Sequence, residues 1–128
     1  MKKLLFIFVS IISALTLSSC GKDEGPTSTV DSDIYYVKYE ISGSSYFYID
    51  EVKYNTDKGT KSDTYAAARS FSTICGPVKK GFHAEIEITR HRGYPKSNEA
   101  TKISVSKNNG PFTVKKSGTL SASYSIDF

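Results

Sequence analysis

The feature that most constrains this fold is an alternation of apolar and polar residues with a period of two. It is clearest in the stretch GFHAEIEITRHRG, residues 81–93. The apolar side chains of this stretch share one phase: Phe82, Ala84, Ile86 and Ile88. Because successive side chains of an extended strand point to opposite faces, the pattern predicts a half-buried β-strand. His83 falls on its polar face, beside Glu85.

The same alternation marks both ends of the globular part of the chain. Near its start the apolar phase holds Tyr35, Val37, Tyr39 and Ile41. At the end of the chain it holds Leu120, Ala122, Tyr124, Ile126 and Phe128. Between them, residues 101–118 indicate a hairpin that turns at Asn109-Gly110, a pair that adopts left-handed turns readily.

Four segments interrupt the simple pattern. Residues 44–56 change phase, which favours a β-bulge near Asp50-Glu51. The run Ala66-Ala67-Ala68 could begin a short helix, but no capping residues frame one, so we expect a strand, a bend and a second strand. We expect the segments GPVKK (76–80) and RHRGYPKSNEA (90–100) to be loops.

About seven short strands separated by turn signals predict an all-β fold. Each sheet must bury one apolar face, so the expected architecture is a two-sheet sandwich. We place this domain at residues 34–128, after a segment rich in Gly, Pro, Ser, Thr and charge.

The first residues predict export. Lys2 and Lys3 precede an apolar run from Leu4 to Leu17. That run is shorter than the roughly 20 residues of a membrane-spanning helix. It fits the apolar region of a secretory signal peptide, which we place at residues 1–19.

The residues Leu17-Ser18-Ser19-Cys20 resemble a bacterial lipobox. The resemblance implies cleavage before Cys20, a diacylglycerol on its thiol and an acyl chain on its new amine. Two or more chains give stable anchoring. Residues 20–33 are then a lipidated cysteine and a flexible linker. The expected location is the outer membrane, facing the periplasm or the cell surface, and Lys22-Asp23-Glu24 resembles the export tag of Bacteroidetes surface lipoproteins.

Composition and the reactive side chains narrow the possible functions. Without Lys2 and Lys3, 15 basic residues stand against 13 acidic ones, a net charge of +2 that does not call for nucleic acid. With Cys20 lipidated, Cys75 is a lone thiol, which we interpret as a small buried hydrophobe. A thiol enzyme pairing Cys75 with His83 is the least favoured hypothesis. We predict no catalytic residues, no metal site and no cofactor.

A family resemblance covers residues 36–128. The stretches YVKYEISG, YNTDKGT, FSTICGPVKKGF, ISVSKNNG and SASYSI are similar to those of small Bacteroidetes lipoproteins of unassigned role. The chain also resembles the periplasmic domain of the mycobacterial membrane protein small family. The resemblance implies an immunoglobulin-like or transthyretin-like two-sheet sandwich, and the mycobacterial relatives accompany large lipid exporters.

The excess of tyrosine is the feature most suggestive of binding. Nine tyrosines lie in the mature chain, and neighbours such as Tyr35 and Tyr36 must point to opposite faces. Exposed tyrosine stacks on sugars or anchors a protein partner. The candidate binding residues are Tyr36, Tyr46, Tyr48, Arg90, His91 and Arg92.

We therefore expect a non-enzymatic, lipid-anchored envelope protein that binds a protein partner as an accessory of an envelope or transport complex. The alternative is a surface glycan-binding module. Tyrosines grouped on one sheet face or one loop end would favour the glycan. A broad apolar patch or an open sheet edge would favour the protein.

Overall fold

The alternation that begins at Tyr35 forms a strand with one buried face, as predicted. In the computed structural model, which describes residues 32–128, β1 buries the side chains of Tyr35, Val37, Tyr39 and Ile41. The signal peptide and most of the linker that the sequence predicts lie outside the described residues.

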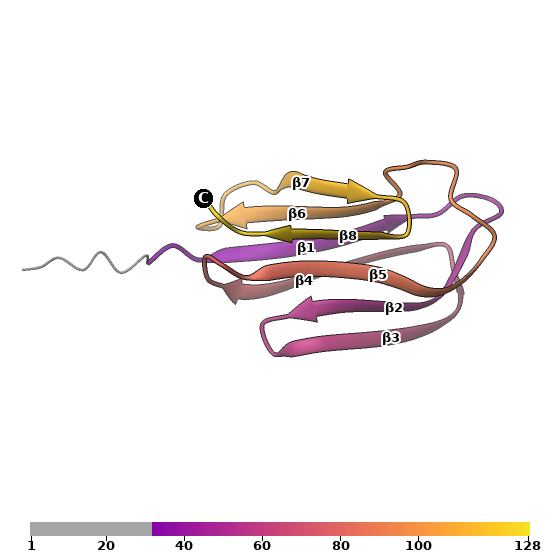
Figure 1. Ribbon diagram of the computed structural model, residues 1–128, viewed down its shortest axis with the longest axis horizontal. Coiled ribbons are helices and arrows are strands. Elements are labelled where there is room, and N and C mark those ends of the chain that lie inside the picture. Colours follow the sequence, from indigo (N-terminus) through magenta and orange to yellow (C-terminus); the bar gives the residue numbers. More distant parts are fainter. Residues whose placement is uncertain (1–31) are drawn as a thin grey trace, which may run out of the picture. The chain divides into compact units, whose positions relative to one another are not determined.

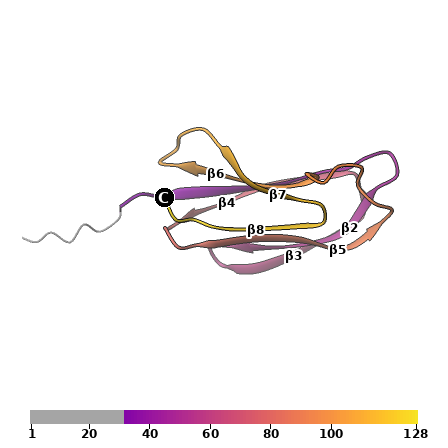
Figure 2. The same cartoon turned by 45° about the horizontal axis from the view of Figure 1, so that its top comes forward.

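Eight strands form two antiparallel four-stranded sheets (Figure 1). Sheet A has the order β4-β1-β6-β7, and sheet B has the order β3-β2-β5-β8. The strands are β1 (Tyr35–Ser42), β2 (Tyr48–Thr56), β3 (Gly59–Ala68), β4 (Ser70–Val78), β5 (His83–Arg92), β6 (Thr101–Lys107), β7 (Thr113–Gly118) and β8 (Ser121–Ser125). The turned view separates the two layers (Figure 2). The predicted two-sheet sandwich is confirmed, with eight strands rather than about seven.

Two irregular positions were predicted correctly. The ladder of β2 shifts register between Ile49 and Val52, so that Ile49 and Val52 are both buried despite their odd spacing. The alanine run is a crossing between sheets, where Ala67 adopts a φ of 64° and β3 of sheet B leads directly into β4 of sheet A.

Three local predictions were wrong. The segment 76–80 is not all loop, because β4 continues through Pro77 to Val78, which pairs with Tyr35. Residues 90–92 likewise belong to β5, and the loop begins only at Gly93. The hairpin turns at Asn108 and Asn109, whose φ values of 49° and 63° are left-handed, rather than at Asn109-Gly110. Asparagine tolerates this region, so glycine is not required there.

The two sheets are joined by tyrosine hydroxyls as well as by apolar packing. The hydroxyl of Tyr39 in sheet A donates to the backbone oxygen of Asn55 in sheet B at 2.7 Å. It also accepts from the backbone N–H of Glu85 at 3.3 Å. The Tyr39 ring contacts the Tyr54 ring, with centroids 5.6 Å apart. Burial raises the pKa of both tyrosines well above the usual value, so both hydroxyls stay protonated at neutral pH.

The sandwich has two poles that differ in the loops they carry. At the proximal pole the described chain begins, and Asp33 there binds Lys107 at 2.7 Å and Asn108 at 2.8 Å. At the distal pole lie the β1–β2 loop, the β3–β4 crossing and the β5–β6 loop (Figure 1). The eight residues of β1 separate the poles by about 25 Å. No helix among residues 32–128 is long and apolar enough to cross a membrane.

We predict that Tyr39→Phe lowers the free energy of unfolding by about 1–2 kcal/mol, because the backbone groups of Asn55 and Glu85 lose a buried partner. Urea denaturation measures this loss. The control is Tyr46→Phe, at a ring that is 74% exposed, which should change stability by less than about 0.5 kcal/mol. Equal stability of the two variants would contradict the bridging role of Tyr39.

Candidate functional site: the distal cluster

The loops of the distal pole touch one another through glycines. A Cβ atom on Gly93 would overlap the carbonyl oxygen of Tyr46, and one on Gly43 would overlap that of Arg69. Gly93 also has a φ of 76°, a conformation that other residues adopt at a cost. These contacts bring side chains from four segments together. We name them the distal cluster: Tyr46, Tyr48, Asp50, Arg69, His91, Arg92, Tyr94 and Lys96.

The centre of the distal cluster is the Tyr48 ring, which contacts two guanidinium groups. Arg69 lies 5.2 Å and Arg92 lies 5.7 Å from the ring centroid. Arg69 also donates to the Tyr48 hydroxyl at 3.2 Å. These contacts hold Tyr48 and both arginines in a fixed arrangement at the ends of β2 and β5.

Asp50 also holds the Arg92 side chain in place. Nε and one terminal nitrogen of Arg92 donate to the two carboxylate oxygens of Asp50, at 3.0 and 2.8 Å. This pair of bonds is the strong, geometrically specific form of the arginine–carboxylate contact. The bonds from Arg92 lower the pKa of Asp50, and the carboxylate in turn raises the pKa of Arg92. Both groups are therefore charged at neutral pH.

Two tyrosines project from this rigid base into solvent. Tyr46 and Tyr94 are each 74% exposed. The Lys96 ammonium lies 5.9 Å from the centroid of the Tyr46 ring. The Tyr94 ring packs edge-on against His91 at 5.5 Å, and His91 in turn contacts the buried Phe47. The cluster thus presents exposed aromatic surface beside charged hydrogen-bonding groups.

The structure brings five of the six candidate binding residues to this pole. Tyr46, Tyr48, His91 and Arg92 belong to the distal cluster, and Arg90 pairs with Glu51 in the adjacent ladder. Tyr36 lies elsewhere, on the outer face of sheet A.

Sequence reasoning missed the contributions of Asp50, Arg69 and Tyr94. The basic and aromatic composition of residues 90–96 could have suggested Tyr94. Arg69 reaches the site only because the chain crosses between sheets beside it, which depends on tertiary structure.

Tyr36 belongs to a second surface, which we name the sheet A patch: Tyr36, Ile74, Phe112 and Val114. Ile74 and Val114 are 54% and 52% exposed. Beneath them Ser104 and Ser106 are almost fully buried, although both face outward from the sheet. A shallow hollow of about 250 Å³ separates Tyr36, Ile74 and Phe112.

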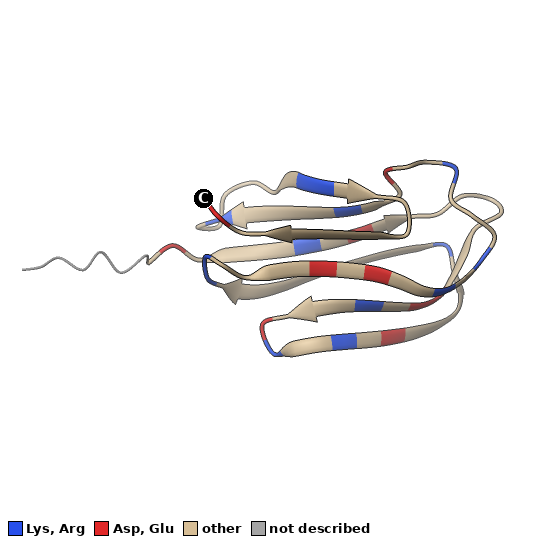
Figure 3. Ribbon diagram, viewed as in Figure 1, with Lys and Arg blue, Asp and Glu red and all other residues tan. Residues whose placement is uncertain are grey.

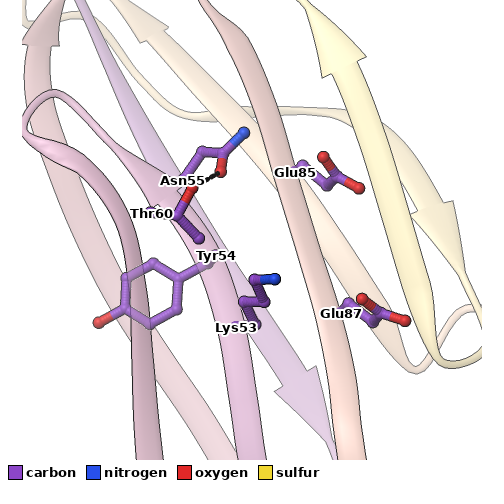
Figure 4. Close-up of a pocket in the computed structure, with 6 residues that line it drawn as sticks. All are labelled: Lys53, Tyr54, Asn55, Thr60, Glu85 and Glu87. Atoms are coloured by element: carbon purple, nitrogen blue, oxygen red, sulfur yellow. Dashed lines mark hydrogen bonds between the residues drawn. The ribbon is translucent and has the colours of Figure 1, made fainter.

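A third surface, on the outer face of sheet B, is polar. Figure 4 shows a hollow of about 150 Å³ between β2, β3 and β5, with Glu85 and Glu87 along one side. Lys53 stands opposite Glu87 in the β2–β5 ladder, and Thr60 donates to Asn55 at 2.9 Å. Within residues 32–128 no group of three or more His, Cys, Asp and Glu side chains is placed to hold a metal ion.

Cys75 and His83 contact different groups of the protein. The Cys75 thiol is half-buried and lies 3.7 Å from the backbone oxygen of Asn55. Burial raises its pKa to about 11. The two ring nitrogens of His83 lie 2.9 Å from the Ser125 hydroxyl and 3.9 Å from the Glu85 carboxylate. His83 is therefore the neighbour of Glu85 that the sequence predicts.

Comparison of this chain with protein-family models, with curated proteins and with solved structures found no significant match.

We predict that iodoacetamide leaves Cys75 almost unlabelled in the native protein at pH 7.5, because a pKa of about 11 keeps all but a minute fraction of the thiol protonated. The reagent should label Cys75 fully in urea, as mass spectrometry of its peptide would report. Labelling at the same rate in both conditions would contradict this account and revive the thiol-enzyme hypothesis.

Proposed function

We propose that this chain is a lipid-anchored protein of the bacterial outer membrane whose distal cluster binds a saccharide. The observation that carries the proposal is the grouping of Tyr46 and Tyr94, each 74% exposed, around the fixed Tyr48, Arg92 and Asp50. Sugar rings stack their C–H faces on aromatic side chains, and their hydroxyls exchange hydrogen bonds with paired carboxylate and guanidinium groups.

The kind of exposed surface favours a saccharide over a protein at this pole. The large hydrophobic residues exposed in the distal cluster are tyrosines, which carry a polar tip. The exposed aliphatic side chains Ile74 and Val114 lie on the sheet A patch instead. The centre of a protein interface is depleted in aspartate and lysine, whereas this cluster contains Asp50 and Lys96.

The anchor and the cluster are compatible in position. The proposed lipid is carried on Cys20, thirteen residues before Asp33. Asp33 lies at the proximal pole, so the distal cluster is at the far end of the sandwich from the tether. The relationship to small Bacteroidetes lipoproteins is part of this proposal.

A protein-binding accessory is the second candidate, and the open side of the sandwich favours it. β3 and β4 each pair with one neighbour only, and a groove of about 280 Å³ beside them includes Lys61, Ile74 and Gly76. An unpaired strand edge can accept a strand from a partner. Protection of the β3 amides from hydrogen exchange in intact envelopes, and not in the purified protein, would favour this candidate.

We predict that mass spectrometry of the protein from its producing bacterium finds an N-terminal Cys20 carrying a diacylglycerol and an acyl chain. Cys20→Ala should leave the protein uncut and unacylated, because both modifications require the thiol. Fractionation of the envelope would follow the loss of the mature, detergent-soluble form. An uncut and unmodified N-terminus in the native protein would remove the anchor from the proposal.

We predict that a glycan array finds a saccharide ligand for the purified protein, and that Tyr46→Ala and Tyr94→Ala each weaken its binding by about tenfold, the equivalent of losing one stacked ring. Tyr65→Ala is the matched control, since Tyr65 is an exposed tyrosine on β3. The proposal fails if no glycan binds, or if the three variants bind equally well.

A further inference from the structure

The two sheets carry different charge. The strands of sheet A hold five lysines and one glutamate, whereas those of sheet B hold four basic and five acidic residues. Figure 3 shows this difference as lysines along β1, β6 and β7 and glutamates along β5. The charge-bearing residues of sheet A are Lys38, Glu40, Lys102, Lys107, Lys115 and Lys116. Sheet A is therefore the side that an anionic surface attracts.

Three of these lysines have no ion-pair partner among residues 32–128. Among the described residues, ion pairs join Lys38 to Glu40 at 3.2 Å and Lys107 to Asp33 at 2.7 Å. The same residues contain no carboxylate within ion-pair distance of Lys102, Lys115 or Lys116. The ammonium of Lys38 lies 5.9 Å from the centroid of the Phe112 ring, so positive charge lies beside the apolar side chains of the sheet A patch. Lys115 lies over the Phe128 ring instead, 4.1 Å from its centroid.

The sheet A patch also lies near the point where the described chain begins. Its hollow is bordered by Asn109 and Gly110 of the β6–β7 turn. The residue before them, Asn108, donates its side-chain amide to Asp33 and its backbone N–H to the Ile34 oxygen, and its side-chain oxygen accepts from the Ile34 N–H. Two further exposed lysines, Lys79 and Lys80, follow the strand end where Val78 pairs with Tyr35. The apolar surface, Lys79, Lys80 and the start of the described chain therefore share one end of sheet A, whereas Lys102 stands opposite Glu40 toward the other end.

We infer that the sheet A patch, together with Lys38, Lys79 and Lys80, rests on an anionic lipid surface and so fixes how the domain stands on the membrane. This inference rests on the proposed anchor at Cys20, because a thirteen-residue tether holds the proximal pole close to the bilayer. Exposed Ile74, Phe112 and Val114 enter the headgroup region, and nearby ammonium groups meet lipid phosphates.

A membrane suits this surface better than a protein does. A stable protein interface takes roughly 20–30 residues from each partner, and the four apolar residues of the patch fall far short of that. A tethered domain needs little additional binding energy, because the anchor already keeps it at the surface. Lysine stems also extend over apolar surface while their charged ends reach the headgroups.

The test uses the lipidated mature protein reconstituted in vesicles, with a polarity-sensitive fluorophore on Val114→Cys in a Cys75→Ala background. The control carries the same fluorophore on Tyr94→Cys, at the distal pole. With phosphatidylglycerol in the vesicles, the emission from position 114 should shift to the blue and that from position 94 should not. High salt, or phosphatidylcholine alone, should reduce the shift because screening weakens the lysine contacts.

A second variant separates lipid contact from a local effect of the label. Ile74→Glu should abolish the blue shift at position 114, and the matched Tyr94→Glu should leave it intact. The inference is overturned if the two labelled positions behave alike on anionic vesicles, or if position 114 responds only when an envelope protein extract is added. Mass spectrometry of Cys20 distinguishes these outcomes from failure of the anchor itself.

Discussion

The sandwich depends on the contact that Tyr39 makes across its two sheets. The ring fills core volume, and its hydroxyl satisfies backbone groups of Asn55 and Glu85 in the opposite sheet. A buried hydroxyl without a partner would cost free energy, so the position of sheet B against sheet A is fixed by hydrogen bonds as well as by packing. Tyr35 acts similarly, donating to the backbone oxygen of Phe128 and holding the end of the chain.

Tyrosine has two roles in this protein: some rings fill the core, and others are exposed at the distal pole. The chain contains no tryptophan, and tyrosines supply much of the aromatic volume of its core. Tyr35, Tyr39 and Tyr54 point inward, with their hydroxyls bonded to protein atoms. Tyr46 and Tyr94 are exposed at the distal pole, beside Lys96 and His91 respectively. The direction of each ring follows from its strand phase or from the loop that carries it.

The strand phases could be predicted from the sequence because burial of one face imposes a period of two. The core phase of β1 and the bulge in β2 are both visible in the order of apolar residues. The end of β5 could not be placed, since residues 90–92 are polar on both faces and resemble a loop. Their strand form depends on pairing with Tyr48 and Ile49 of β2, a contact between distant residues.

The candidate site was predictable in its chemistry and not in its full membership. An excess of tyrosine beside a basic segment pointed to Tyr46, Tyr48, His91 and Arg92. This sequence pattern could not separate those four residues from Tyr36. Tyr36 lies on β1 near the opposite pole, a position that becomes apparent only once β1 is seen to run the length of the sandwich. The sequence pattern also could not identify Arg69, which lies beside Tyr48 because the chain crosses between the sheets there.

The central claim is that the inward tyrosines hold the fold and the outward ones at the distal pole bind a ligand. Nitration by tetranitromethane, mapped by mass spectrometry, tests it most directly when the protein in intact envelopes is compared with the detergent-purified form. We predict that Tyr46 and Tyr94 are nitrated in the purified protein and protected in the envelope, while Tyr35, Tyr39 and Tyr54 stay unmodified in both. Nitration of Tyr39 in the native protein, or equal nitration of Tyr46 and Tyr94 in both preparations, would contradict the account.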